Sequence, residues 1–355
     1  MKLDIKNLNG EAKRLSEFLK SKIISQREAI DEVCNGAQKY FSGISDPKKP
    51  ISNFLFAGPT GSGKTQLVNH IGEFFGLDPV VINCGEMQDK HELSKLLGAP
   101  PGYIGHGDTK PLLSKEKIEL KGKPNVILFD EIEKTSPALY NMLLGILDNG
   151  YVTTNSNVDV YFNNCFIFMT CNIGIKTANK EEAKMGFVSK TFIDNEKEEF
   201  IIKEIKKEFS PEFFNRIDKT IVFKTLTKED VFNIFDLELF YIQERLANCE
   251  AKKIFFSASD DVKEKLVNLS YSPEYGARSL KRTLEKEIVL PLSNALSLDE
   301  VEDGDYILMS MEEDGEFFFT KEEYTRQKGS SVSISMIEIN GMLTVCIQVE
   351  LDINS

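Results

Sequence analysis

The chain has 355 residues, 41% of them hydrophobic, so it can bury a full core, and its length favours two or more domains. Lysine and arginine number 43 against 56 aspartate and glutamate, a net charge of -13 that argues against duplex DNA or an anionic membrane as the main partner. A charged start and the lack of any apolar run of roughly 18 residues argue against a signal core and a membrane span. The six cysteines are scattered singly, so we expect reduced thiols and a cytoplasmic location.

The amino-terminal residues 1–45 carry apolar side chains at a spacing of three and four residues. Leu15, Phe18 and Leu19 begin the pattern, and Ile30 and Val33 continue it. This spacing predicts an amino-terminal helical segment. Two prolines within residues 46–50 interrupt the pattern, and we expect the segment to end there.

Short, nearly continuous apolar runs follow, separated by stretches compatible with helices. Such runs are typical of strands buried on both faces, and their alternation with helices predicts an α/β fold built on a parallel sheet over residues 46–226. The five runs are residues 54–56, 80–82, 126–129, 166–170 and 221–223.

The first run leads directly into a phosphate-binding loop pattern. The loop consists of Gly58, Pro59, Thr60, Gly61, Ser62, Gly63, Lys64 and Thr65. Glycines let successive backbone N–H groups point at phosphate oxygens. Lys64 is expected to reach the outer phosphates of ATP, and Thr65 to supply a hydroxyl to Mg²⁺. The alternative is a glycine-rich turn without a ligand, but the strand before the loop and the helical pattern after it favour a nucleoside triphosphate.

The third run ends in two adjacent carboxylates, Asp130 and Glu131, which is a Walker B ending. A carboxylate at a strand tip can hold Mg²⁺ through water, which is the role expected of Asp130. Glu131 can orient and polarise the water that attacks the γ-phosphate. An acidic turn after a buried strand is the alternative interpretation, and the nearby phosphate loop disfavours it.

From residue 227 the pattern changes to long amphipathic helices at roughly 228–248, 259–270 and 277–297. Short strand candidates lie at residues 253–256, 306–309 and 317–320. We therefore expect a smaller, mainly helical domain over residues 227–325. In the last segment, residues 326–355, apolar residues alternate on both sides of Asn340 and Gly341, which predicts a hairpin with a type I′ turn.

Several further segments resemble the Clp branch of AAA+ ATPases, and most closely the second ATPase module of ClpA-, ClpC- and ClpB-type chaperones. Residues 130–134 read Asp-Glu-Ile-Glu-Lys, a form used in that branch, and residues 98–105 resemble its pore loop. Residues 168–174 resemble its sensor 1 segment, residues 209–218 its arginine-finger segment and residues 275–282 its sensor 2 helix. The resemblance implies an AAA+ large domain followed by a helical lid.

The resemblance also implies roles for individual residues. Asn172 would lie near the attacking water, Arg216 would be the arginine finger, and Arg278 would face the nucleotide from the lid. Ile24 lies where the family has a hydrophobic-Gly-Gln stretch near the adenine, and Ser25 departs from that pattern. Without a ring of subunits, an arginine at either position would by default be a solvated surface charge, and Asn172 could merely cap a turn.

Two segments point to partners. Tyr103 and Ile104 would project into the channel of a ring and grip a polypeptide, although Tyr103 could instead pack on the core. Met185, Gly186 and Phe187 resemble the apolar-Gly-apolar tripeptide with which some Clp unfoldases dock on a barrel-shaped, ClpP-like peptidase. The alternative is that Met185 and Phe187 pack onto the large domain.

The sequence therefore predicts an ATPase that unfolds proteins by threading polypeptides through a homo-hexameric ring, with a ClpP-like peptidase as a candidate partner. Three alternatives stay open at this point. The chain could be a stand-alone remodelling or disaggregating ATPase, a nucleic-acid AAA+ motor, or a non-hydrolysing scaffold. The acidic net charge disfavours nucleic acid, and the presence of Glu131 and Arg216 disfavours a scaffold.

Overall fold

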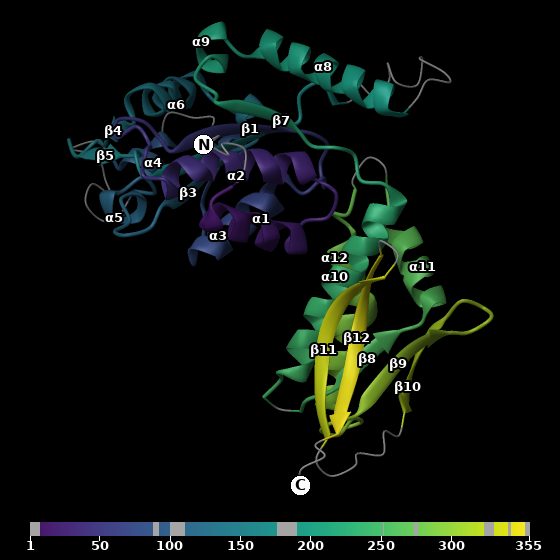
Figure 1. The fold of residues 1–355 in the computed structure, drawn as a ribbon. Helices are drawn as coiled ribbons and strands as arrows, with labels where there is room; N and C mark the ends of the chain where they lie inside the picture. Colours follow the sequence, from purple (N-terminus) through teal and green to yellow (C-terminus); the bar gives the residue numbers. More distant parts are fainter. Residues whose placement is uncertain are drawn as a thin grey trace, which may run out of the picture. The chain divides into compact units, whose positions relative to one another are not determined.

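The computed structural model describes residues 8–87, 92–99, 111–175, 190–250, 252–272, 276–322, 330–339 and 342–351. The chain divides into two compact units, Met1–Lys224 and Thr225–Ser355 (Figure 1).

A five-stranded sheet in the order β2-β3-β6-β1-β7 forms the centre of the first unit, and every pairing in it is parallel. Its strands are β1 (Ser52–Ala57), β2 (Val80–Asn83), β3 (Asn125–Asp130), β6 (Cys165–Cys171) and β7 (Lys219–Val222). Each of the five apolar runs became one of these strands. The α/β fold with a parallel sheet is therefore confirmed.

The central strands bury side chains on both faces, and alternate residues enter two different cores. Phe54 and Phe56 of β1 pack with α1 (Gly10–Lys22), α2 (Arg27–Phe41) and α3 (Lys64–Phe75). Leu55 and Ala57 pack on the other face with α6 (Pro137–Asn149), α8 (Lys190–Glu208) and α9 (Pro211–Phe214). Phenyl rings fill the first core. The ring centroid of Phe168 in β6 lies 5.3 Å from the ring centroids of both Phe54 and Phe56. Burying such a side chain contributes about 1.5–3 kcal/mol.

Several small elements have no counterpart in the sequence prediction. The antiparallel hairpin of β4 (Tyr151–Thr153) and β5 (Asp159–Tyr161) is one, and α4 (Leu93–Leu97) and α5 (Lys115–Ile118) are others. Their sequences are too short for periodicity to identify. Helix α8 was not predicted either. Its described buried residues, Ile201 and Ile205, lie in its second half, and two apolar positions are too few to indicate a helix.

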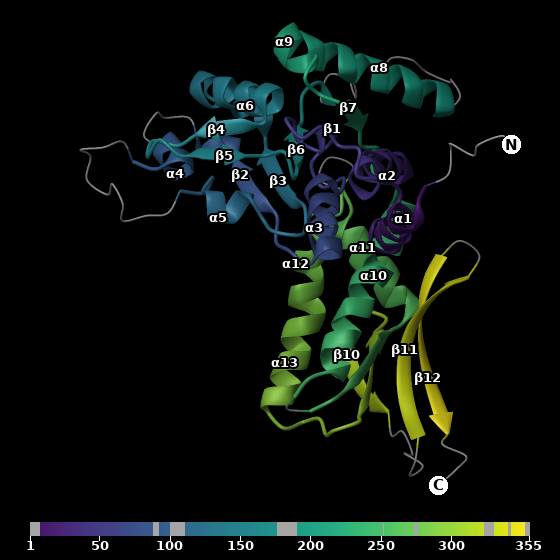
Figure 2. The same cartoon turned by 60° about the vertical axis from the view of Figure 1, so that its left-hand side comes forward.

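The second unit combines helices with two small sheets (Figure 2). Its helices are α10 (Lys228–Ala247), α11 (Asp260–Ser270), α12 (Leu280–Leu284), the π-helical turn η3 (Glu285–Val289) and α13 (Leu290–Ser297). A capping box of Thr227 and Asp230 begins α10. The predicted helix over residues 277–297 thus begins at Leu280 and changes to π geometry part-way. Strands β8 (Phe255–Ala258), β9 (Tyr306–Met311) and β10 (Phe317–Glu322) form one sheet in the order β10-β9-β8.

The last two strands, β11 (Ser330–Ile339) and β12 (Met342–Leu351), pair antiparallel along their full length. They form a sheet of their own, as the alternating sequence predicted. The two residues of the predicted turn, Asn340 and Gly341, lie outside the described residues.

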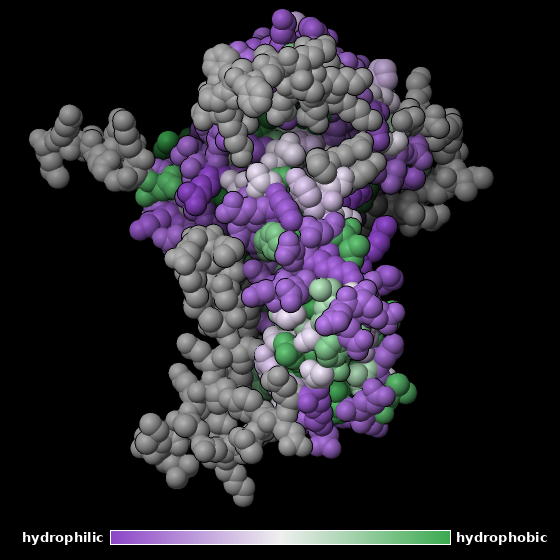
Figure 3. Space-filling model, turned by 90° about the vertical axis from the view of Figure 1, so that its right-hand side faces the viewer, coloured by the Kyte–Doolittle hydropathy of each residue, from purple (hydrophilic) through white to green (hydrophobic). Residues whose placement is uncertain are grey.

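Hydrophilic side chains cover much of the face shown in Figure 3, and apolar side chains gather over the second unit. Among the described side chains of that unit, the large apolar ones that are exposed are Leu269, Leu290 and Leu298. Within the described ranges, no helix combines the length and apolar character needed to cross a membrane.

Candidate functional site

Three neighbouring strands end at one edge of the parallel sheet and bring their following residues together there. β1 leads into the phosphate loop, β6 leads into Asn172, and β3 ends at Asp130. The register places Ala57 opposite Cys171, and the Gly58 N–H donates to the Cys171 carbonyl at 3.3 Å. The carboxyl ends of parallel strands are where ligands bind in open α/β sheets.

The phosphate loop needs its glycines for two different reasons. Gly61 and Gly63 adopt φ of 77° and 99°, the left-handed region that other residues rarely enter. At Gly58 a Cβ atom would lie 2.8 Å from Cβ of Phe223, so a side chain has no room there. Helix α3 begins at Lys64 directly after Gly63, and the free N–H groups of its first turn can bind phosphate oxygens.

Lys64 is only 8% exposed and its ammonium group lies within the loop. The Nζ atom donates to the carbonyls of Gly58 at 2.7 Å and Pro59 at 2.9 Å, and to Oδ1 of Asn172 at 3.0 Å. Burial lowers the pKa of Lys64 to about 8. Nearby acidic groups raise this pKa and so compensate part of the effect of burial. A buried ammonium group whose desolvation is only partly compensated can attract an anionic phosphate.

The two carboxylates after β3 are held in different ways. Asp130 accepts a short hydrogen bond from the Thr170 hydroxyl, and the same oxygen of Thr170 accepts from the Glu131 N–H at 3.0 Å. Glu131 has a left-handed backbone with φ of 58°, an uncommon conformation for a residue other than glycine. Its carboxylate forms an ion pair with Lys134 at 2.6 Å.

A third acid, Glu133, connects the Walker B turn to Asn172. Its Oε1 atom accepts from the Asn172 N–H at 3.1 Å and from the Asn172 side-chain amide at 3.5 Å. Because Asn172 in turn accepts from Lys64, the three side chains form a continuous chain of hydrogen bonds. Burial raises the pKa of Glu133, and its second oxygen has no hydrogen-bond partner among the described residues.

This edge of the sheet suits a nucleoside triphosphate with a divalent cation. Backbone N–H groups and Lys64 can neutralise phosphate charge, while Thr65 and Asp130 offer the hard oxygen ligands that Mg²⁺ prefers. Thr65 is in the first turn of α3, and its side chain is exposed.

Arg216 lies at the opposite edge of the sheet, where β1 begins. Its carbonyl accepts from the side chain of Asn53 at 3.4 Å, at the start of β1, whereas the phosphate loop follows the end of β1. The five residue-to-residue steps from Asn53 to Gly58 span about 16 Å of strand. The guanidinium is held by Asp148 of α6, with Nε 2.9 Å from one carboxylate oxygen. Arg216 therefore lies away from the phosphate loop of its own chain.

Ile24 lies in the short connection between α1 and α2, half-buried. The next residue, Ser25, has φ of 76°. The left-handed conformation explains why a glycine is usual at this point of the related pattern, and Ser25 adopts it despite its side chain.

The remaining predicted residues either belong to the second unit or lie outside the described residues. Arg278 belongs to the second unit, where it is exposed in the turn before α12. Tyr103 and Ile104 lie outside the described residues, as do Met185, Gly186 and Phe187. The start of the pore-loop motif is described: the Asn155 side chain of the β4–β5 turn donates to the Gly98 carbonyl at 2.5 Å.

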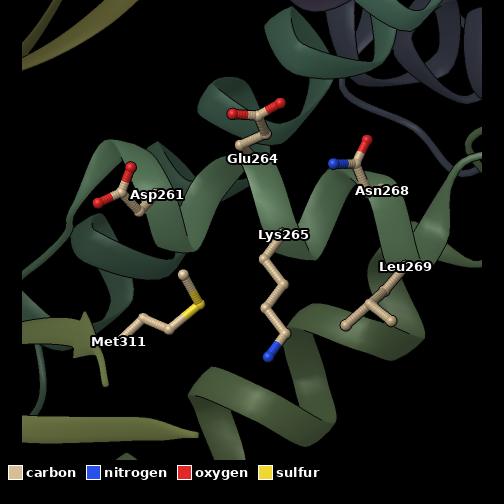
Figure 4. Close-up of a pocket in the computed structure, with 6 residues that line it drawn as sticks. All are labelled: Asp261, Glu264, Lys265, Asn268, Leu269 and Met311. Atoms are coloured by element: carbon tan, nitrogen blue, oxygen red, sulfur yellow. The ribbon is translucent and has the colours of Figure 1, made fainter. Parts of the chain in front are cut away.

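A hollow of about 390 Å³ lies on the second unit, along one side of α11 (Figure 4). Its lining residues are Asp261, Glu264, Lys265, Asn268, Leu269 and Met311. The Lys265 side chain extends between Met311 and Leu269, but its ammonium already donates to the Gly315 carbonyl and lies 4.9 Å from the Phe317 ring. The phosphate-loop edge is accordingly the better candidate site.

Sequence reasoning assigned no role to two residues that organise the site, Thr170 and Glu133. Thr170 is fully buried and is the one hydroxyl in the apolar run of β6. Its position could have indicated a role, because a lone polar residue at the carboxyl end of a buried strand needs a buried hydrogen-bond partner.

Comparison with known proteins agrees with this geometry. The AAA domain (Cdc48 subfamily) matches residues 49–220, and the C-terminal, D2-small domain of ClpB protein matches residues 226–309. Chaperone protein ClpB of Aquifex aeolicus is 36% identical over 92% of this chain, which covers 32% of that protein. The ATP-dependent Clp protease ATP-binding subunit ClpC of Staphylococcus epidermidis is 36% identical over 90% of the chain, covering 39% of that protein.

Solved structures give the same result. The S. cerevisiae Hsp104:casein complex in its extended conformation superposes with a TM-score of 0.74 and 29% sequence identity, over 90% of this chain and 53% of that chain. The fold, the phosphate loop and the matching domains define an AAA+ ATPase module. Within that class the chain belongs to the Clp family and resembles the second ATPase module of its chaperones. It spans about a third of the length of these ClpB and ClpC relatives.

The lowered pKa of Lys64 predicts that nucleotide binding takes up protons in mildly alkaline solution. Near its pKa of about 8 the free amine is partly neutral, and phosphate charge stabilises the protonated form. Calorimetric titration of ADP in buffers of different ionisation enthalpy should show uptake that increases from about pH 7.5 to about pH 9.

Lys64→Arg is the control, since a guanidinium stays charged throughout this range and its binding should involve no such uptake. Proton release at about pH 9, or uptake that does not change with pH, would contradict the assignment of a partly neutral lysine.

Proposed function

We propose that this chain is an ATP-dependent protein unfoldase that works as a hexameric ring and threads polypeptides through its central pore. In this proposal residues 46–226 form the large ATPase domain, residues 227–325 the lid and residues 326–355 a hairpin extension. The observation that carries it is the placement of Arg216 at the sheet edge opposite the phosphate loop. This placement supports a role for Arg216 at the nucleotide of a neighbouring subunit.

Within one subunit, the phosphate-loop edge would bind ATP and carry out hydrolysis. Lys64 and the first turn of α3 would neutralise the phosphates, and Thr65 and Asp130 would hold Mg²⁺, which supplies charge stabilisation to the phosphates. Glu131 would accept a proton from the attacking water, and Asn172 would orient that water. Glu133 supports the position of Asn172 through two hydrogen bonds.

Between subunits, Arg216 would stabilise the charge on the transferred phosphoryl group. Its ion pair with Asp148 holds it on the surface of its own subunit, and its side chain is still 28% exposed. Such a finger can be worth roughly 10³ to 10⁵ in rate. Arg278 would reach the nucleotide from the lid, and Ile24 would contact the adenine.

A polypeptide is the proposed substrate. This choice is supported by the similarity to the chaperone protein ClpB and to Hsp104 in its complex with casein. The net charge of -13 does not favour a nucleic-acid substrate. Tyr103 and Ile104 would grip the chain as the ring turns over ATP. The hydrogen bond from Asn155 to Gly98 anchors the first residue of this motif to the β4–β5 hairpin.

Two versions of this function differ in what happens to the unfolded product. The Met185-Gly186-Phe187 tripeptide favours delivery to a ClpP-like peptidase, as does the similarity to ClpC, which is named as the ATP-binding subunit of a Clp protease. Similarity to the chaperone protein ClpB favours stand-alone remodelling. Either version fits a cytoplasmic protein, since Cys34, Cys84, Cys165 and Cys171 are buried thiols outside any disulfide.

Lys64→Ala and Glu131→Gln should produce different defects. Loss of the lysine removes phosphate binding, whereas loss of the Glu131 carboxylate leaves binding intact and removes the group that polarises water. We expect no detectable nucleotide binding by Lys64→Ala, and parental binding with turnover reduced at least about 100-fold by Glu131→Gln. Fluorescent-nucleotide titration and phosphate release measure the two quantities. Parental turnover by Glu131→Gln would remove Glu131 from this role.

Arg216→Ala should lower turnover at least about 1,000-fold without a comparable loss of nucleotide binding, because the arginine acts on a neighbour in the transition state. Mixed rings give the sharper test. Arg216→Ala subunits retain an intact phosphate loop, and Lys64→Ala subunits retain the finger, so mixing should restore part of the activity. No recovery in rings whose mixed assembly is verified by mass would count against action across a subunit boundary.

Tyr103→Ala should hydrolyse ATP at the parental basal rate but lose the unfolding of a tagged fluorescent protein, because the phosphate site is untouched and the bulky grip is removed. Tyr151→Ala is a matched control, since Tyr151 is an exposed tyrosine of the same unit outside the predicted motif. Unchanged unfolding by Tyr103→Ala would show that this tyrosine does not grip substrate.

A further inference from the structure

Gln26 has a buried side chain that contacts two distant parts of the first unit. It is 4% exposed and lies at the start of α2. Its Nε2 atom donates to the Ser62 carbonyl at 3.2 Å and to the Lys224 carbonyl at 3.0 Å. Its Oε1 atom accepts from the Lys224 N–H at 3.1 Å. One carboxamide thus joins the phosphate loop to the residue that follows β7 by two positions.

Local structure gives no other reason for this side chain. Gln26 occupies the N-cap position of α2, where a side chain usually accepts from the first turn, yet it makes no capping hydrogen bond. The preceding Ser25 adopts its left-handed backbone at an energetic cost, and this turn directs the chain into α2. The connection between α1 and α2 therefore lacks a capping hydrogen bond, because the Gln26 side chain forms its hydrogen bonds with Ser62 and Lys224 instead.

The contact with Ser62 acts directly on the phosphate loop. The Ser62 carbonyl and the Gly63 N–H belong to one planar peptide unit and point in opposite directions. Holding the carbonyl toward Gln26 consequently fixes the direction of the Gly63 N–H on the loop's other side. Gly63 itself adopts φ of 99° and has no side chain to hold it in place.

The contact with Lys224 acts at the end of the first unit. Lys224 is its last residue, and Thr225 begins the second unit. Because both the N–H and the carbonyl of Lys224 bond to the Gln26 carboxamide, the backbone is fixed at the point where the chain leaves the first unit.

We propose that Gln26 is a positioning residue that couples nucleotide binding at the phosphate loop to the backbone at the junction of the two units. The inference rests on the proposed nucleotide site. When phosphate fixes the Gly63 peptide, the Ser62 carbonyl is held on Gln26, and the same amide restrains Lys224. Nucleotide state is thereby transmitted to the linker through one side chain.

Three variants of the full chain test this coupling. Gln26→Met removes all three hydrogen bonds, and Gln26→Glu keeps an acceptor for the Lys224 N–H but no donor for Ser62. Gln243→Met is the matched control, because Gln243 is a buried glutamine of the second unit, 2% exposed, whose amide donates to the Phe256 carbonyl. Affinity for a fluorescent ADP analogue and amide hydrogen exchange across residues 224–227, with and without saturating ADP, are the readouts.

We expect both Gln26 variants to bind ADP about fivefold to tenfold more weakly, the change that corresponds to one lost hydrogen bond. ADP should slow exchange at residues 224–227 in the parent and in Gln243→Met, but not in either Gln26 variant, even at saturation. Without ADP, Lys224 should exchange faster than in the parent only in Gln26→Met, since Gln26→Glu retains the acceptor.

Affinities within about twofold of the parent, with the ADP-dependent protection retained, would overturn the coupling and leave Gln26 a structural residue. If Gln26→Met does not fold by circular dichroism, Gln26→Glu decides by the same criteria. A folded parent that binds no ADP would refute the nucleotide site and the coupling with it, whereas a binding parent with unaffected Gln26 variants refutes the coupling alone.

Discussion

The parallel pairing of β1, with β6 on one side and β7 on the other, is the constraint on which the rest of the first unit depends. Its register sets Ala57 beside Cys171, so the phosphate loop and Asn172 leave the sheet as neighbours. Phe54 and Phe56 are buried on one face while the smaller Leu55 and Ala57 are buried on the other, so a one-residue slip would exchange side chains of different size between two close-packed cores. The same register places Arg216 near the beginning of β1, a full strand length from the loop.

The parts of this architecture that follow from local pattern could be predicted from the sequence. Runs buried on both faces identify central strands, and the glycines of the phosphate loop are required by backbone geometry that no other residue type meets easily. Asp130 and Glu131 could be placed because they directly follow such a strand. In each case the determining information lies within a few residues of the position.

The parts that escaped prediction depend on contacts between segments distant in sequence. Thr170 bonds to Asp130, and Glu133 bonds to Asn172, across 40 and 39 positions of the chain. Gln26 reaches Lys224 over 198 positions. Periodicity contains no information about such pairs. The β4–β5 hairpin and α4 were missed for a simpler reason, since three to five residues are too few to establish a period.

The ion pair of Arg216 with Asp148 has a consequence for how the ATPase responds to dilution. An isolated subunit keeps its arginine neutralised by its own α6, and Glu212 lies 3.7 Å away as a second acid. In the proposed ring, assembly would exchange this intramolecular partner for an intermolecular one, and part of the interface free energy would be used to break the existing, partly exposed pair. Under this proposal the ion pair within the subunit would compete with assembly, so ATP turnover would depend on the assembled protein and would rise more steeply than the amount of protein present.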